Sequence, residues 1–226
     1  MIKIENTEVF GWEAAIRGMR NPMNSWEKSD SGMAWCGEIE ARNRIGEPDL
    51  DGYVSFVGPN DLKLMQQLSK AGSDHGKFLR MINVTMDVTA PLYWWKEAST
   101  YRVGVTMNSC STMHKIHAKE FTLDDFSHEH LTSFMLNSLK GTIDHLNLAR
   151  SNYLEIKNKD DWWQMIQLLP SSYNQRRTVQ LNYQVLKNMY FARKNHKLDE
   201  WRDFCKWVEE LPYFKEICIE PMEEKT

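Results

Sequence analysis

Hydrophobic and polar residues alternate most regularly between Ile82 and Thr89. The apolar members of this run are Ile82, Val84, Met86 and Val88. A period of two is typical of a β-strand with one buried face. Thr89 and Pro91 are suited to the cap and first turn of a helix. The pattern therefore predicts a strand over 81–89, followed by a helix over 92–102.

Elsewhere the spacing of apolar residues is helical, and caps or prolines bound several of the segments. We predict helices over 10–19, 61–71, 123–153, 160–169, 178–193 and 198–211, and a short strand over 2–5. The polar segment 104–111 is expected to be a loop. The sum is an α+β fold, dominated by helices, with one small sheet.

Residues 23–60 show no sustained periodicity and are rich in Ser, Gly, Asp, Asn and Pro. Segments of this kind are uncommon in compact domains unless they are functional or disordered. We interpret 23–60 as an irregular insertion or a lid. A chain of 226 residues suits one hydrophobic core, so 1–220 is expected to form a single domain, with 221–226 as a charged tail.

Charge and composition exclude several functions. The net charge is −3 and no long basic run is present, which argues against nucleic acid as a partner. No stretch approaches the roughly 18 apolar residues of a membrane span, and residues 1–6 do not resemble a signal peptide. The four cysteines form no C-x-x-C pair. Reduced thiols and a cytoplasmic location are therefore expected.

Two kinds of local cluster have a functional and a structural interpretation. His114 and His117, with His128 and His130 nearby, resemble metal-ligand spacing, but no further ligands follow in a recognisable pattern. Solvated or capping roles are favoured, and no metal site is predicted. The pairs Trp94-Trp95 and Trp162-Trp163 are candidates for stacking on a planar ligand, although packing in the core explains them better.

Two blocks of the chain resemble the flavin-dependent thymidylate synthases. The first family block has a histidine, a strand, a proline, a helix, Arg-His-Arg and a serine after seven further residues. The second block has Leu-Pro, Thr-x-Asn, another asparagine and an arginine. The matching positions here are His75, the 81–89 strand, Pro91 and Arg102, then Leu169-Pro170, Asn182, Asn188 and Arg193. The match covers roughly residues 70–195 and leaves those before about 60 unexplained.

The chain departs from the family pattern at positions that carry charge. Thr100 and Tyr101 stand in place of the first Arg and the His of the triplet, and Gln180 replaces the threonine. Cys110 occupies the position of the family serine, with Ser111 next to it. Ile166 stands where the family has an arginine that binds substrate phosphate.

The resemblance implies a fold with a small antiparallel sheet and several long helices, and a specific reaction. Enzymes of this family methylate dUMP to dTMP with methylene-tetrahydrofolate, using a hydride from reduced FAD and electrons from NADPH. They work as homotetramers. Catalysis rests on orientation and electrostatics, since no protein nucleophile is required.

By the same resemblance, residues of this chain take roles in cofactor binding, substrate binding and catalysis. The cofactor residues would be His75, Lys77, Arg102, Asn182 and Asn188, with Lys77 as a compensating cation for which Arg80 and Lys96 are alternatives. The substrate residues would be Glu97, Asn108, Ser109 and Arg193, and the catalytic residues Arg102, Arg193, Cys110 and Ser111. Five of these groups, at positions 75, 102, 182, 188 and 193, are expected to meet around a single planar ligand.

Three functions remain open from the sequence. The first is a flavin-dependent thymidylate synthase-like protein that binds FAD and a pyrimidine nucleotide, and that methylates dUMP or makes a related uridylate modification. The second is a non-catalytic protein on the same scaffold, such as a phage would encode, which sequesters a nucleotide. The third is an interaction protein with no small-molecule ligand.

Overall fold

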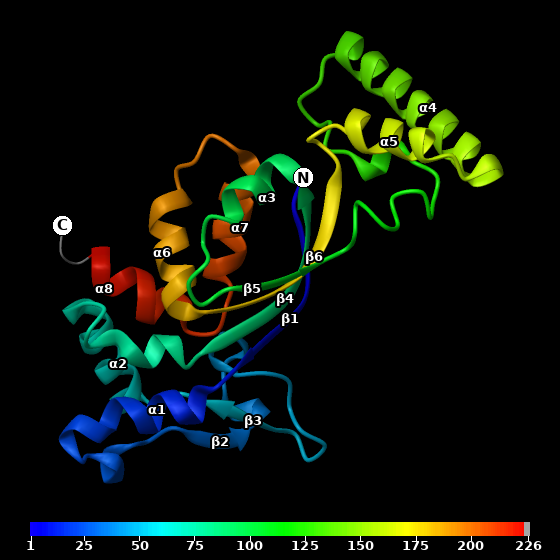
Figure 1. Cartoon of the computed structure of the whole chain (residues 1–226). Helices are drawn as coiled ribbons and strands as arrows, with labels where there is room; N and C mark the ends of the chain where they lie inside the picture. Colours follow the sequence, from blue (N-terminus) through cyan, green and yellow to red (C-terminus); the bar gives the residue numbers. More distant parts are fainter. Residues whose placement is uncertain (224–226) are drawn as a thin grey trace. The chain divides into compact units, whose positions relative to one another are not determined.

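The computed structural model describes residues 1–223, without the side chain of Arg42. Over these residues the chain forms eight α-helices and two small sheets (Figure 1). Four strands pair in the order β1-β4-β6-β5, and β2 pairs with β3. The predicted α+β class, with a small antiparallel sheet and several helices, is confirmed.

The strands are β1 (Lys3–Phe10), β2 (Gly32–Trp35), β3 (Tyr53–Phe56), β4 (Asn83–Pro91), β5 (Thr106–Ser109) and β6 (Asn174–Asn182). The helices are α1 (Trp12–Arg20), α2 (Pro59–Ala71), α3 (Leu92–Ala98), α4 (Ser133–Ile156), α5 (Lys159–Leu168), α6 (Tyr183–Arg193), α7 (Asp199–Glu209) and α8 (Glu220–Glu223). The last three residues of the predicted charged tail lie outside the described part of the chain.

Packing divides the chain into two compact units. Unit 1 consists of Met1–Glu5, Asp87–Thr100 and Met107–Thr178, and unit 2 of the other described residues. The boundary passes through strands of the larger sheet. The single domain expected over 1–220 stays a prediction.

Strand β4 follows the alternating pattern of its sequence. Ile82, Val84, Met86 and Val88 are at most 2 % exposed. Pro91 closes the strand and precedes α3, which needs no side-chain cap. The predicted strand and the helix after it are confirmed, but α3 ends at Ala98, so Arg102 lies beyond the helix.

Strands β4 and β6 run antiparallel. The backbone N–H of Leu92 donates to the carbonyl of Tyr173, and that of Tyr183 donates to the carbonyl of Ile82, each at 3.0 Å. One end of β4 therefore adjoins the opposite end of β6. Residues 178–182, which were predicted to be helical, belong to this strand because the sheet satisfies their backbone groups. The predicted helix over 178–193 is wrong in its first five residues.

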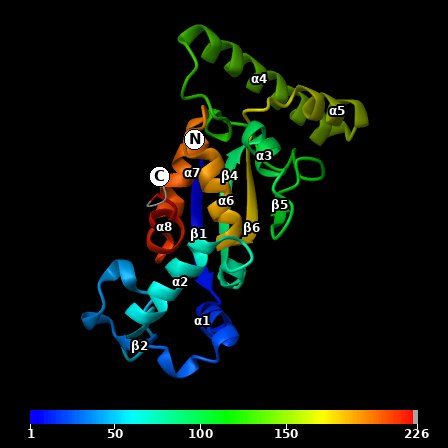
Figure 2. The ribbon, with the colours of Figure 1, turned by 90° about the vertical axis from the view of Figure 1, so that its left-hand side faces the viewer.

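Unit 1 is built around the pair α4 and α5, which lie side by side in both views (Figures 1 and 2). Their inner faces bury one apolar cluster together with the segment that precedes α4. Its members are Ile116, Phe121, Phe126, Leu139, Ile143, Leu146, Ala149 and Met165. The predicted helix over 123–153 starts ten residues late, at Ser133, because Thr132 provides the N-cap.

Unit 2 contains the other large helices. Helices α6 and α7 pack against each other (Figure 1), and their facing side chains, Leu186, Met189, Trp201 and Phe204, are at most 3 % exposed. The segment 23–60, predicted to be irregular, contains β2 and β3. Their register pairs Gly32 with Phe56 and Trp35 with Tyr53. Four-residue strands are too short to produce a clear period in the sequence.

A buried ion pair joins the last residue of α1 to the start of α2. Arg20 Nε donates to Asp61 Oδ1 at 2.6 Å, and the two side chains are 4 % and 0 % exposed. The other carboxylate oxygen, Oδ2, accepts from the hydroxyls of Ser29 and Ser31 and from two backbone N–H groups. All of these donors lie between the two helices or on α1, so Asp61 organises the loop that leads into β2.

Asp30 in the same loop caps α2 from a distance. Its carboxylate oxygens accept from the backbone N–H groups of Asn60 at 2.9 Å and of Asp61 at 3.1 Å. These are two of the N–H groups that a helix start leaves without partners. A Cβ at Gly58 would lie 2.4 Å from Asp30, so the residue before α2 must be glycine for the loop to approach this closely.

Replacing Asp61 with asparagine is expected to destabilise unit 2 by about 3–5 kcal/mol, because it leaves a buried guanidinium without its anion. Burial acts to raise the pKa of Asp61, but hydrogen bonds from Ser31, Ser29 and Arg20 outweigh it, and the pKa lies below its usual value. The ionised carboxylate therefore stabilises the fold above about pH 4, and this contribution is lost as the pH falls through the lowered pKa.

Urea unfolding followed by tryptophan fluorescence measures this difference. The gap between wild type and Asp61→Asn should be constant near neutral pH and should narrow below about pH 4. Asp51→Asn, at an exposed aspartate, is the matched control and should unfold like wild type. An equal loss in both variants would contradict the role of Asp61.

Candidate functional site

The residues predicted for the cofactor lie on three segments of unit 2. These segments are the 3₁₀ turn Gly76–Arg80 with His75 before it, the loop 101–106, and α6 with Asn182 before it. Both of the other segments contact α6.

Asn182 stands at the junction of β6 and α6. Its Oδ1 accepts a hydrogen bond from the backbone N–H of Val185 at 3.1 Å, so the side chain serves as the N-cap of the helix. This leaves Nδ2 as the donor that Asn182 offers to other partners. Asn182 therefore stabilises the start of α6, and any contact that it makes with a ligand would use the amide nitrogen.

The loop 101–106 passes directly against this junction. Gly104 has a φ of +74°, and a Cβ there would lie 3.1 Å from Asn182 Nδ2 and 3.3 Å from a methyl group of Val185. Both the backbone conformation and the close approach require glycine at this position. Arg102, two residues earlier, has an exposed side chain.

Arg193 is half-buried at the last turn of α6. Its Nε donates to the hydroxyl of Tyr101 at 3.1 Å, and its guanidinium carbon lies 4.9 Å from the ring centre of Trp201. A cation over an aromatic face is attracted by the ring electrons. Tyr101 occupies the position where the family resemblance has a histidine, and here it holds Arg193 in place.

The 3₁₀ turn also meets α6. A Cβ at Gly76 would lie 3.8 Å from Gln184 Oε1, and the amide nitrogen of Gln184 donates to Asn188 Oδ1 at 3.1 Å. His75 and Lys77, on either side of Gly76, have exposed side chains. The structure therefore brings the three predicted segments together along one helix.

The span of α6 limits what one ligand can touch. Asn182 and Arg193 are eleven residues apart, at opposite ends of the helix, which corresponds to about 16 Å along its axis. A single planar ring does not reach both ends. The arrangement suits an extended ligand, in which different parts meet different residues, better than the single planar ligand expected from the sequence.

The predicted substrate residues other than Arg193 belong to unit 1. Glu97 lies near the end of α3, and Asn108 and Ser109 lie on β5 with exposed side chains. The segment 104–111 was predicted to be a loop, but 106–109 form this strand. An edge strand places consecutive side chains on opposite faces, so Asn108 and Ser109 point in different directions.

Cys110 and Ser111 follow β5 in unit 1. The backbone of Cys110 is held by two hydrogen bonds, from its N–H to the carbonyl of Arg176 at 2.9 Å and from Gln175 Nε2 to its carbonyl at 2.7 Å. Its thiol is exposed. Ser111 Oγ accepts from the backbone N–H groups of Met113 and His114, at 3.2 and 2.8 Å, so this hydroxyl stabilises a turn.

Arg177 has no role predicted from the sequence. Its guanidinium lies 4.3 Å above the ring of Trp95, and it donates to Gln175 Oε1 at 3.1 Å and to Ser99 Oγ at 3.2 Å. Burial lowers the pKa of this arginine. Within the described chain none of its partners is a carboxylate.

The neighbouring arginine behaves differently. Arg176 is exposed and forms an ion pair with Asp87 at 2.7 Å, on the opposite face of β6. A half-buried guanidinium with neutral partners can accept an anionic ligand, whereas a paired surface arginine is already satisfied. The alternation of side chains along β6 separates these roles, and no strand was predicted from the sequence at these positions.

Other kinds of site find no support over residues 1–223. No three His, Cys, Asp or Glu side chains there lie close enough together to hold a metal ion. No helix in the same range has the length and apolar character needed to cross a membrane. Trp94 and Trp95 are 2 % and 1 % exposed, so the interpretation of this pair as core residues is confirmed.

Comparison with solved structures gives the fold a known counterpart. Two crystal structures of thymidylate synthase X, a flavin-dependent enzyme from Helicobacter pylori, share it. Both hold FAD and dUMP. The TM-scores are 0.66 and 0.63, each at 16 % sequence identity, and the matches cover 99 % and 97 % of this chain and 100 % and 97 % of the others.

This likeness establishes the fold and extends over almost the whole chain, including the residues before about 60 that the sequence motifs left unexplained. No protein-family model matches the sequence, and no curated protein does. The protein therefore has a thymidylate synthase X-like fold. The identity of 16 % carries no conclusion about activity.

Thiol accessibility tests the surroundings of Cys110. Burial raises the pKa of Cys205 to about 11 and that of Cys218 to about 12, and the thiolate is the reactive form. Ellman's reagent should therefore label Cys110 fastest and Cys36, which is half-buried, more slowly. Cys205 and Cys218 should react only after unfolding in guanidinium.

Cys110→Ser should remove the fast phase, and Cys36→Ser should remove only the slower one. A fast phase that persists in Cys110→Ser would show that this thiol is not exposed.

Proposed function

We propose that this protein is a flavin-dependent thymidylate synthase-like protein that binds FAD and a pyrimidine nucleotide. The observation that carries the proposal is the full-length structural match to proteins crystallised with FAD and dUMP. The meeting of three predicted segments along α6 adds support from this chain's own residues.

For FAD, the proposal uses the residues around α6. Lys77 and Arg102 are exposed and form no ion pair within the described chain, so their charges are available to a pyrophosphate. His75 and the amides of Asn182 and Asn188 offer hydrogen bonds to the remaining parts of the cofactor. The length of α6 suits an extended dinucleotide. When bound, FAD supplies hydride chemistry that no side chain provides.

For the nucleotide, the proposal uses the residues that the family resemblance assigns to the substrate, and one further arginine. Glu97, Asn108 and Ser109 are the predicted polar contacts, and Arg177 is the added cation. Arg177 would compensate for the arginine that the family has at the position of Ile166, because a guanidinium binds a phosphate through two parallel hydrogen bonds. The hydroxyl of Ser111 already accepts two hydrogen bonds in its turn, so Cys110 has the freer side chain of these two neighbours.

The complete reaction that we propose methylates dUMP, or modifies a related uridylate, with methylene-tetrahydrofolate and NADPH as co-substrates. Arg102 and Arg193 keep their predicted catalytic roles in this proposal, as cations that orient and polarise the substrate. A homotetramer is part of it. The exposed apolar residues Phe134, Leu148 and Ile156 on α4 give such an assembly a surface to bury.

One observation favours a second function, the sequestering of a nucleotide without turnover. Arg193, which would meet the substrate, donates to Tyr101 and stacks on Trp201. An arginine engaged in this way is less free to polarise a substrate. A phage-encoded protein that binds a nucleotide and removes it from the free pool would need the scaffold but not the reaction.

The visible absorption spectrum tests the cofactor. Freshly purified protein should be yellow, or should become so with FAD, and Arg102→Ala should weaken FAD binding by about tenfold or more, because it removes a charged hydrogen bond. Lys63→Ala, at an exposed lysine on α2, is the matched control. A colourless protein that takes up no FAD on titration would remove the cofactor from the proposal.

Tritium release from C5-labelled dUMP, with FAD, NADPH and methylene-tetrahydrofolate present, then separates the two functions. Release above background supports the enzyme. Binding of dUMP without release supports the sequestering protein.

Isothermal titration with dUMP tests Arg177. Arg177→Met should weaken dUMP binding by about tenfold or more, the effect of losing a charge-assisted hydrogen bond. It should have less effect on deoxyuridine, which has no phosphate. Arg176→Met is the matched control on the neighbouring residue and should bind dUMP like wild type. Equal losses for dUMP and deoxyuridine would contradict a phosphate contact.

A further inference from the structure

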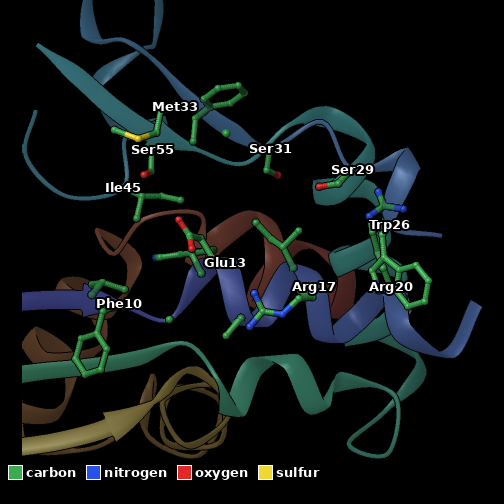
Figure 3. A pocket seen from close by; sticks show the side chains of 17 residues that line it. Phe10, Glu13, Arg17, Arg20, Trp26, Ser29, Ser31, Met33, Ile45 and Ser55 are labelled. Carbon is green, nitrogen blue, oxygen red and sulfur yellow. The ribbon is translucent and has the colours of Figure 1, made fainter. Parts of the chain in front are cut away.

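A cavity of about 820 Å³ lies in unit 2, between α1 and the β2–β3 hairpin (Figure 3). One wall comes from the end of β1 and from α1, and the other from the segment 26–56. None of the residues assigned above to FAD or to the uridylate lines it. Its main side chains are Phe10, Glu13, Arg17, Trp26, Met33 and Ile45.

Two opposite charges on α1 face this cavity. Glu13 and Arg17 are exposed and lie one helical turn apart, in the order that favours an ion pair on a helix surface. Yet their side chains do not pair with each other, and neither side chain forms a hydrogen bond or ion pair with any other residue of the described chain. Figure 3 shows both on the α1 side, across from Met33 and Ser55.

Arg20 provides a contrast on the same helix. It also lines the cavity, but its guanidinium is used by Asp61, by the carbonyl and hydroxyl of Ser25 and by the carbonyl of Lys28. Arg20 therefore holds the fold together. The side chains of Glu13 and Arg17 form no such stabilising contacts within residues 1–223, so their charges are available to a ligand.

The apolar lining offers surfaces for a planar ring. Phe10, Trp26 and Met33 are 43 %, 49 % and 58 % exposed, which is high for side chains of this size. The indole N–H of Trp26 donates to Asn21 Oδ1 at 2.8 Å, so the orientation of this ring is set. Aromatic and thioether side chains bind planar ligands through stacking and contact with the sulfur.

The walls are held apart by the interactions of Asp61 and Asp30. These carboxylates tie the segment 29–31 to the start of α2, and this segment leads directly into β2. The cavity is thus formed without a ligand, as most small-molecule sites are. Its volume falls within the roughly 300–1,000 Å³ of such sites.

We propose that this cavity binds a guanine mononucleotide. The carboxylate of Glu13 would accept hydrogen bonds from the two adjacent N–H donors on the edge of the base. Arg17 would pair with the phosphate, and Met33, which lies across the cavity from Glu13 (Figure 3), would contact a face of the ring. A ligand that carries both donors and an anion matches the two charges, whereas a simple anion would be repelled by Glu13.

The site goes beyond the proposed uridylate and flavin function and shares no residue with it. The cavity volume is larger than a single amino acid would fill, which favours a whole nucleotide, with base, sugar and phosphate, as the ligand.

Isothermal titration of the full chain with GMP tests the proposal. Wild type should bind GMP, and Arg17→Met should weaken GMP binding by about tenfold while leaving guanosine binding unchanged. Glu13→Gln should weaken both ligands, because it alters the contact to the base. Lys63→Met and Glu8→Gln, at exposed residues outside the cavity, are the matched controls and should bind GMP like wild type.

Three results would overturn the proposal. The first is the absence of saturable binding at about 1 mM GMP, or equal binding of AMP. The second is wild-type affinity in both Arg17→Met and Glu13→Gln. The third is displacement of GMP by FAD or dUMP, which would place GMP in the other site. Thermal unfolding checks that each variant is folded, and the FAD titration described above reports on the flavin function independently.

Discussion

The ionised carboxylate of Asp61 is the constraint on which the arrangement of unit 2 depends. A fully buried charge is costly unless it is paired and hydrogen-bonded. Here the compensation comes from Arg20 and from donors in the segment 29–31, which are distant in sequence from position 61. The loop has to adopt one conformation to supply these donors. That conformation in turn sets the path of β2 and the wall of the cavity above α1.

Helix α6 plays the corresponding part for the proposed flavin site. Its first turn is capped by Asn182, its last turn carries Arg193, and the loop containing Gly104 packs against its start. Residues that the family motif places far apart in the chain thus meet on one rigid element. Rigid elements position functional groups more precisely than free loops do.

The arginines of this chain do not follow the motif of the family that its sequence resembles. Thr100 and Ile166 stand where the pattern of the flavin-dependent thymidylate synthases has arginines, while Arg177 places a half-buried guanidinium beside Trp95 without a carboxylate partner. Tyr101 replaces a histidine and binds Arg193 instead. At 16 % identity the two proteins share a fold, and the chemistry of this chain depends on the individual residues of its own site.

The sequence by itself determined the fold class, the strand β4 and the helices α1, α2, α5 and α7 within a few residues. These elements have strong local periodicity, and burial of Ile82, Val84, Met86 and Val88 follows directly from it. The two family blocks also located the segments that meet along α6. In each case the information lies in neighbouring residues, which is where sequence patterns are strongest.

Only the tertiary structure decided the rest. Residues 178–182 are a strand because β4 and β5 lie beside them, although their own pattern favoured a helix. Strands β2 and β3 are stabilised by pairing with each other and are too short to be seen alone. The role of Arg177 depends on whether a carboxylate lies within its reach, which is a property of distant segments. Long-range contacts override local propensity, and they also decide which charges remain available to a ligand.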